Sequence, residues 1–451
     1  MTPVKTLIEK IDNIAIFATE FERLKNTFPE NVFLKNIRTK AFESFLNQGL
    51  PNKKNEEYKY ASPEKLFFKV PFDCQVSTEK INQKEIEKYF IQNLNATVVV
   101  TINGSLSKEN STFGNLPKGV IICDFSEAIK QHSEIFEKHF SASADVNLDA
   151  FLALNTALAT NGLFIYVPEN THFEKPLHLV NLLTAKKSAF LNTRNLIVIE
   201  NKSELKIVET FDTVDLPVKL ITNSVTEISV GENAHVQYYT IQKECENGNH
   251  IHATHVQQQA NSHFDTNTIT LGGSWIRNNL NIALNAKHCE THLNGLFITK
   301  ENQHVDNHTF VDHRQPNCES RQLYKGILYD KSIGVFNGKI MVRPDAQKTN
   351  AYQSSKNILL SDDATINAKP QLEIYANDVK CSHGTSTGRL ADEALFYLRS
   401  RGISEPTAKN LLMYAFTADV LDTLKLEALK TYVETLVEKE LQHELNKNDA
   451  N

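Results

Sequence analysis

The stretch DVKCSHGTSTGRL, residues 378–390, places a cysteine and a histidine two positions apart. Alternate residues of a β-strand project to the same face, so Cys381 and His383 can present a sulfur and an imidazole side by side. A thiolate with an imidazole suits zinc or iron-sulfur species, which normally take four ligands. The pair is therefore half of a metal site, and the remaining ligands have to come from elsewhere. Val379 shares the parity of both residues, which leaves open that the two side chains point into a core.

A second candidate lies in the segment HCETH, residues 288–292, whose histidines are four positions apart. Zinc-protease helices use the order HExxH, which this segment lacks, and the alternation around it is typical of a strand. A metal site at His288, Glu290 and His292 is therefore the less favoured interpretation. The chain also has no GxGxxG motif that opens a helix and no phosphate-binding loop, so we expect it to bind no nucleotide itself.

Composition narrows the classes of partner. The 451 residues are enough for two or three domains, and the net charge of −6 comes from 48 basic and 54 acidic residues spread along the chain. Because no basic run could neutralise phosphates, nucleic acid is not an expected partner. The segment from Met1 to Phe17 mixes charges among apolar positions, and no later apolar run approaches the length of a membrane span. We expect a cytoplasmic protein that makes no membrane contact, with its six isolated cysteines reduced.

The first region, residues 1–162, is predicted to be a helical and mixed α/β domain. Apolar residues recur at helical spacing until Gly49 and Pro51 end the pattern. Further on, a strand is predicted in ATVVVTINGS (96–105) and another apolar run in GVIICDF (119–125). A helix is predicted in VNLDAFLALNTALATNG (146–162), because its leucines share one face.

The second region, residues 163–388, is predicted to be a β-solenoid. The helical period vanishes there, and a unit with apolar ends and a polar middle recurs as VPENTHF, IENKSEL, VGENAHV and LSDDATI, starting at Val167, Ile199, Val230 and Leu360. The first three starts are almost evenly spaced, and self-similarity at a nearly fixed interval is typical of solenoids. The repeat is blurred between Ala260 and Leu328, so an irregular antiparallel sandwich remains an alternative.

The third region, residues 389–451, is predicted to be a helical domain. Ser404 is suited to the N-cap of one helix, with Pro406 in its first turn. That helix is more apolar than a single stripe against the solenoid requires, at Leu411, Leu412, Ala415, Phe416, Ala418 and Leu421. A protein partner that covers the remainder and a simple cap on the solenoid are both open interpretations.

Several segments together resemble the SufB/SufD family of iron-sulfur cluster assembly proteins, and within it the SufD branch. The similar segments span nearly the whole chain and are NEEYKY (55–60), GVFNGKIMVRPDAQKTNAYQSSKNILLS (334–361), DVKCSHGTSTGRL (378–390), DEALFYLRSRGI (392–403) and AKNLLMYAF (408–416). Departures are modest: Tyr58 stands where the family usually has tryptophan, and Ala61 where threonine is common.

The resemblance implies a right-handed parallel β-helix flanked by helical domains. It also implies a non-catalytic scaffold subunit that pairs with SufB and carries the ATPase SufC on its C-terminal helices, and the isolated chain could pair with a second copy instead. His383 would meet a SufB cysteine at the interface, where a transient iron-sulfur cluster forms, with Cys381 as its close neighbour. The half-site at the end of the solenoid would then be completed by the partner.

Three other interpretations stay open. A polysaccharide lyase or hydrolase on a β-helix would need clustered acid and base groups, for which Asp306, Asp312 and Arg314 are the compact candidates. A purely structural subunit would clamp SufB and SufC together without any ligand of its own. SufB itself is the nearest alternative within the family, but the CSHG motif and the isolated cysteines favour SufD.

Overall fold

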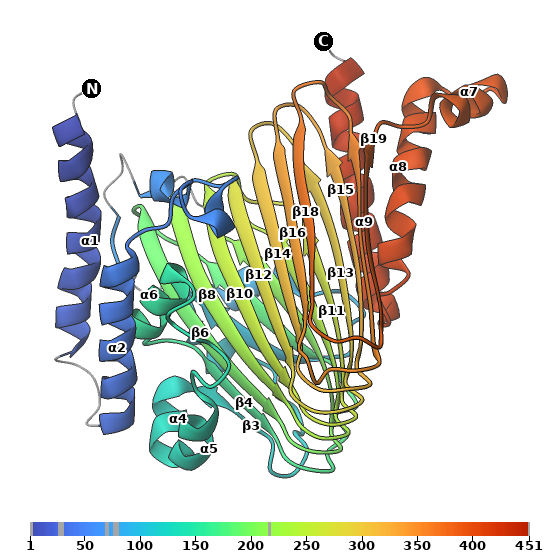
Figure 1. The fold of residues 1–451 in the computed structure, drawn as a ribbon. Coiled ribbons are helices and arrows are strands. Elements are labelled where there is room, and N and C mark those ends of the chain that lie inside the picture. The colour runs from blue at the N-terminus through green and yellow to red at the C-terminus, as the bar shows by residue number, and fades with distance from the viewer. Residues whose placement is uncertain (1–2, 26–30, 68–71, 75–80, 215–217, 450–451) are drawn as a thin grey trace.

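The computed structural model describes residues 3–25, 31–67, 72–74, 81–214 and 218–449. Over these residues the strands stack into two long sheets that face each other, and consecutive strands from β4 onward alternate between the sheets (Figure 1). Neighbouring strands are parallel, except where β1 meets β2 and β3 meets β4. This arrangement is a parallel β-solenoid, which confirms the predicted fold class and rules out the antiparallel sandwich.

The bounds of the strands follow the chain around the coils. In spatial order, the ten-stranded sheet contains β19 (Val379–Gly388), β17 (Thr349–Leu359), β15 (Glu319–Leu328), β13 (Glu290–Thr299), β11 (His263–Thr270), β9 (His235–Lys243), β7 (Glu204–Thr213), β5 (Leu177–Leu183), β1 (Thr97–Ile102) and β2 (Ser105–Leu106). The nine-stranded sheet contains β18 (Thr365–Ile374), β16 (Ile333–Val342), β14 (His304–His313), β12 (Trp275–Leu284), β10 (Gly248–Gln258), β8 (Leu220–Val230), β6 (Ala189–Ile199), β4 (Leu163–Val167) and β3 (Ile121–Asp124).

Alternation along each strand separates the inside of the solenoid from its outer faces. On β9, Val236 and Tyr238 belong to the interior cluster together with the preceding Ala234, whereas Tyr239 and Ile241 pack outward against the C-terminal helices. The corners carry residues with positive φ, which asparagine tolerates better than most residues: Asn170, Lys202, Asn233, Asn261, His288, Glu301, Asn317, Asp330 and Lys348.

The coils differ in length, and this explains why the sequence repeat is blurred in its middle part. Asn249 pairs with Trp275 on the next coil of its sheet, whereas Ile333 pairs with Thr365, so the first of these two coils is the shorter one. The strands still stack in register, because the variation is taken up at the corners.

The N-terminal helices pack on one outer face of the solenoid. They are α1 (Pro3–Lys25), α2 (Val32–Gln48), α3 (Gln83–Ile86), α4 (Phe125–Gln131), α5 (Ser133–His139) and α6 (Ala150–Leu158), with 3-10 turns at Glu56–Tyr58, Pro63–Leu66, Glu87–Tyr89 and Lys108–Asn110. Phe17 and Phe45 from α1 and α2 join one core with Phe190 and Ile221 of β6 and β8. Asp149 caps α6 by accepting hydrogen bonds from the backbone N–H groups of Phe151 and Leu152, which stabilises this helix end.

The C-terminal helices pack on the opposite sheet. They are α7 (Asp392–Ser400), α8 (Glu405–Leu421) and α9 (Glu427–Asp449). Met413 of α8 and Val433 of α9 share a core with Leu296 of β13 and Ile327 of β15, while α7 projects away from the body (Figure 1). Ser404 occupies the N-cap position of α8 as predicted, but its hydroxyl contacts the Thr407 hydroxyl at 2.8 Å and caps no backbone N–H. Within the described residues, no helix combines the length and apolar character that crossing a membrane requires.

Candidate functional site

Cys381 and His383 lie on β19, the last strand of the ten-stranded sheet. Ala351 pairs with Cys381, and Gln353 pairs with His383, so both side chains continue the inward-facing row of β17. On β17 this row is buried, with Ala351 at 0% and Gln353 at 3% exposure. On β19 it becomes exposed, because no further described strand stacks on this edge. The two residues therefore lie at the open end of the solenoid.

The thiol of Cys381 lies on the less exposed side of this end. Cys381 is half-buried and packs against an apolar cluster that includes Val342, Ala351 and Ala376. Burial raises the pKa of the Cys381 thiol, because desolvation disfavours the thiolate. This thiol is thus held protonated until a ligand that prefers the thiolate approaches it.

The imidazole of His383 is exposed. Next to it, a Cβ added at Gly384 would meet no atom within 4 Å, and the same holds at Gly388. The surroundings of His383 are therefore open on the side that a partner would approach.

The described residues do not complete a metal site around this pair. No group of three or more histidine, cysteine, aspartate or glutamate side chains within them is placed to hold a metal ion. A zinc or iron site needs more ligands than Cys381 and His383 provide. The geometry thus matches an incomplete half-site on an accessible edge.

Comparison with known proteins agrees with this geometry. A model of the N-terminal region of SufBD proteins matches residues 11–179, and a model described as "SUF system FeS cluster assembly, SufBD core domain" matches residues 181–416. The chain belongs to the SufB/SufD family of iron-sulfur cluster assembly proteins. An iron-sulfur cluster assembly SufBD family protein of Synechocystis is 30% identical over 409 residues, which cover 89% of this chain and 90% of that protein.

Two further relatives carry the name SufD. The iron-sulfur cluster assembly protein SufD of Escherichia coli is 29% identical over 396 residues, covering 87% of this chain and 89% of that protein. SufD of Bacillus subtilis is 27% identical over 426 residues, covering 92% of this chain and 95% of that protein. The SufBD chain described here is accordingly SufD-like.

The HCETH segment lies at a corner and on the outer face of this SufBD solenoid. His288 occupies the corner with a φ of 61°, and Cys289 is buried. His292 lies on β13, and its Nδ1 is 2.8 Å from an Asp265 carboxylate oxygen, which raises the pKa of His292. The strand-like interpretation is confirmed, and Glu290 joins the same surface ion pairs through a 3.3 Å contact with His292.

The carboxylates that a polysaccharide-active enzyme would need are both engaged in ion pairs. Asp306 is 1% exposed and lies 2.7 Å from Arg277 and 2.9 Å from His308. Asp312 lies between Arg314 at 2.8 Å and Arg343 at 2.9 Å. These partners hold the pKa of both carboxyl groups below the ordinary aspartate value, so neither carboxyl is protonated to act as a general acid.

The NEEYKY segment acts in a way that sequence reasoning did not foresee. Arg277 donates a hydrogen bond to the backbone oxygen of Glu57 at 2.9 Å, and its guanidinium lies 3.9 Å from the centre of the Tyr58 ring. His308 contacts the Glu57 carboxylate at 3.3 Å, and the Tyr58 hydroxyl donates to Asp149. We call Glu57, Tyr58, Arg277, Asp306 and His308 the N-terminal clasp, because they fasten the N-terminal region to β12 and β14.

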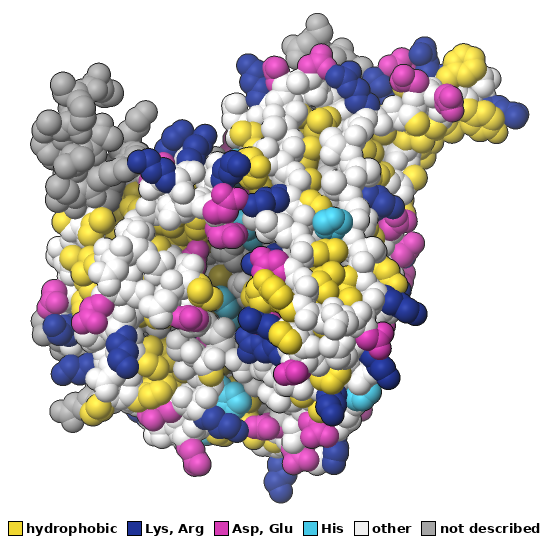
Figure 2. All heavy atoms as spheres, viewed as in Figure 1, with side chains coloured by type: hydrophobic (Ala, Val, Ile, Leu, Met, Phe, Trp, Pro, Cys, Tyr) yellow, Lys and Arg dark blue, Asp and Glu magenta, His cyan; other side chains and the backbone are white. Residues whose placement is uncertain are grey.

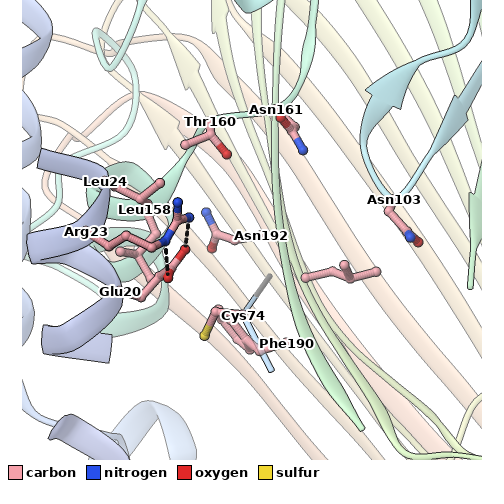
Figure 3. A pocket seen from close by; sticks show the side chains of 11 residues that line it. Glu20, Arg23, Leu24, Cys74, Asn103, Leu158, Thr160, Asn161, Phe190 and Asn192 are labelled. Atoms are coloured by element: carbon pink, nitrogen blue, oxygen red, sulfur yellow. Dashed lines mark hydrogen bonds and ion pairs between the residues drawn. The ribbon is translucent and has the colours of Figure 1, made fainter. Parts of the chain in front are cut away.

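Two hollows flank the clasp and the N-terminal helices. A cleft of about 500 Å³ lies beside the clasp, and its basic residues already have acidic partners, as in the 2.7 Å pair of Lys339 with Glu373. A pocket of about 440 Å³ is lined by α1, α6 and β6 (Figure 3). There Arg23 is paired with Glu20 at 2.5 Å, and burial raises the pKa of the Cys74 thiol to about 12. Cys74 is therefore a protonated thiol at neutral pH and not a reactive thiolate.

Proposed function

We propose that this chain is a scaffold subunit that pairs with SufB through the open end of its solenoid and there presents His383 to a nascent iron-sulfur cluster. The observation that carries this proposal is the exposed His383 on an unpaired edge strand, with too few ligands around it. Cluster iron would be a shared cargo: the imidazole supplies one ligand, and the partner supplies the thiolates. Cys381 would be a second ligand from this chain once its proton is removed.

The edges of the last coil support pairing with another strand. β18 and β19 are terminal in their sheets over the described residues, and each is ten residues long. Long unpaired edges present free backbone N–H and C=O groups, which a partner strand can satisfy. β18 contains Pro370, which lacks an N–H donor, whereas β19 contains no proline. We therefore place the main pairing edge on β19.

The C-terminal helices would carry the ATPase SufC. None of the side chains of α7 is buried, and Phe396 and Tyr397 are 75% and 57% exposed. Figure 2 shows hydrophobic side chains gathered along this projecting arm. A contiguous exposed apolar surface of this kind is typical of a site that a protein partner covers.

The chain connection gives this docking a mechanical consequence. β19 ends at Gly388 and α7 begins at Asp392, so residues 389–391 alone separate the proposed ATPase site from the strand that bears His383. ATP-driven pairing of two SufC subunits would move α7 and thereby pull on β19. In this mechanism the chain itself is a lever and a scaffold, and the ATP chemistry belongs to the partner.

The test compares His383→Ala with His172→Ala, which removes an imidazole that is 63% exposed elsewhere on the solenoid. Each variant is co-expressed with SufB and SufC, and iron and acid-labile sulfide are measured per purified complex. We expect both variants to form the complex, but only His383→Ala to prevent cluster build-up. Normal cluster assembly by the His383→Ala complex would overturn the proposal. A separate variant, Phe396→Ser, should lose SufC while it keeps SufB.

A further inference from the structure

A ladder of amide side chains runs beneath His383. Gln322 on β15 pairs with Gln353 on β17, and Gln353 pairs with His383 on β19, so the three side chains occupy one inward-facing row. Gln353 Nε2 donates to Gln322 Oε1 at 3.1 Å, and the Thr309 hydroxyl donates to the same oxygen at 2.8 Å. The ladder thus connects the interior of the solenoid to the imidazole at its open end.

The rung directly below His383 has an unused acceptor. Gln353 is 3% exposed, yet its Oε1 has no hydrogen-bond partner in the described residues. The amide lies against the bare backbone of Gly338, where an added Cβ would come within 2.2 Å of Gln353 Nε2. Because Nε2 is committed to Gln322, Oε1 is the atom left to accept from a neighbour in the row. A buried acceptor without a partner is costly, so such an atom calls for an explanation.

An imidazole that binds a metal through one ring nitrogen needs an acceptor for the N–H of the other. Ligating histidines almost always donate this N–H to a carboxylate, a carbonyl oxygen or water, which fixes the orientation of the ring and raises its basicity. We propose that Gln353 is the positioning residue of His383: its side-chain carbonyl accepts the second ring N–H when the first ring nitrogen binds cluster iron. This inference rests on the proposed function and assigns the residue that prepares its histidine.

The decisive comparison is between two buried amides on the same strand. Gln353→Met removes the acceptor below His383 and keeps the length of the side chain. Asn357→Leu is the matched control, because Asn357 is also 3% exposed with an unpartnered side-chain oxygen among the described residues, but it pairs with Thr387. Gln353→Glu keeps an acceptor oxygen at the same reach and serves as the rescue variant. All three are prepared as full complexes with SufB and SufC.

Two measurements separate positioning from a structural effect. Thermal unfolding and co-purified SufB report the fold, and the initial rate of cluster assembly reports the site. For Gln353→Met we expect an assembly rate about 10-fold or more below that of the Asn357→Leu complex, with rescue by Gln353→Glu, at equal complex yield. In addition, pulsed electron paramagnetic resonance of the reduced cluster should show one sharp ¹⁴N coupling in the wild type and a broadened one in Gln353→Met.

Equal assembly rates for the Gln353→Met and Asn357→Leu complexes would overturn the positioning role, as would a folded Gln353→Glu complex as slow as Gln353→Met. If the Met variant does not fold, Gln353→Ser takes its place with the same expectation. His383→Ala distinguishes the two levels. If that variant assembles clusters normally, the proposed function fails together with this inference; if it is inactive while Gln353→Met is fast, only the positioning role fails.

Discussion

Asp306→Asn tests whether the N-terminal clasp holds the SufBD chain together. The substitution keeps the size of the side chain but removes the charge that faces Arg277 at 2.7 Å and His308 at 2.9 Å. Arg277 is 2% exposed, so it would remain as a buried cation without its counter-charge. Removing one partner of a buried ion pair costs about 3–5 kcal/mol, and the hydrogen bond of Arg277 to Glu57 and its contact with Tyr58 do not replace a charge.

The assay is reversible urea unfolding of the isolated chain at neutral pH, followed by limited proteolysis. Asp362→Asn is the control, because it breaks the pair of Asp362 with Arg389, whose side chains are 85% and 70% exposed. Exposed pairs contribute little, so this control should hardly change the free energy of unfolding. Asp306→Asn should also expose the segment around Glu57 and Tyr58 to protease.

The same variant predicts a change in pH dependence. The folded-state pKa of Asp306 is lowered by His308 and Arg277, which oppose the effect of burial. A carboxyl group with a lowered pKa contributes stability that is fully present above its unfolded pKa and is lost as the pH falls through the folded pKa. Asp306→Asn should therefore flatten the acid side of the stability curve. Equal stability of Asp306→Asn and Asp362→Asn, with the same acid slope, would refute the role of the clasp.

Three further predictions concern other parts of the chain. Hydrogen bonds to Asp265 raise the pKa of both His235 and His292, so their contribution to stability is present below the ordinary value of 6.5 and is lost as the pH rises through the raised values; Asp265→Asn should remove this slope in urea midpoints measured from pH 5 to 8, and an unchanged slope would contradict the pairing. Alkylation followed by mass spectrometry should label Cys381 faster than the buried Cys289 and Cys318, with a rate that rises with pH because burial raises the Cys381 pKa; equal labelling of all three would show that the open end is covered. Gly162→Ala should lower the free energy of unfolding by about 1–3 kcal/mol, because its Cβ would lie 1.5 Å from the backbone oxygen of Arg194, whereas Gly388→Ala meets no atom within 4 Å and should be nearly neutral in the same urea titration.

Much of the solenoid was predictable because its determinants are local. Alternation at Ala234, Val236 and Tyr238 and the polar corners follow from the pleat of a strand and from the turn preferences of asparagine. The blurred repeat was harder to interpret, since a coil can lose residues at a corner without losing register, as between Asn249 and Trp275. The division into residues 1–162, 163–388 and 389–451 stays a prediction, although β1 and β3 of the first region already extend the two sheets.

The sequence alone determined that Cys381 and His383 share a face, because alternate residues of a strand do so wherever the strand lies. It could not decide whether that face is buried, since the same parity buries Ala351 and Gln353 one coil earlier. Only the tertiary structure decided this: β19 is the last described strand of its sheet, so its inward row has no coil above it. The same holds for Gln353 and Arg277, whose partners are distant in the chain and become neighbours only when the coils stack and the N-terminal region folds over them.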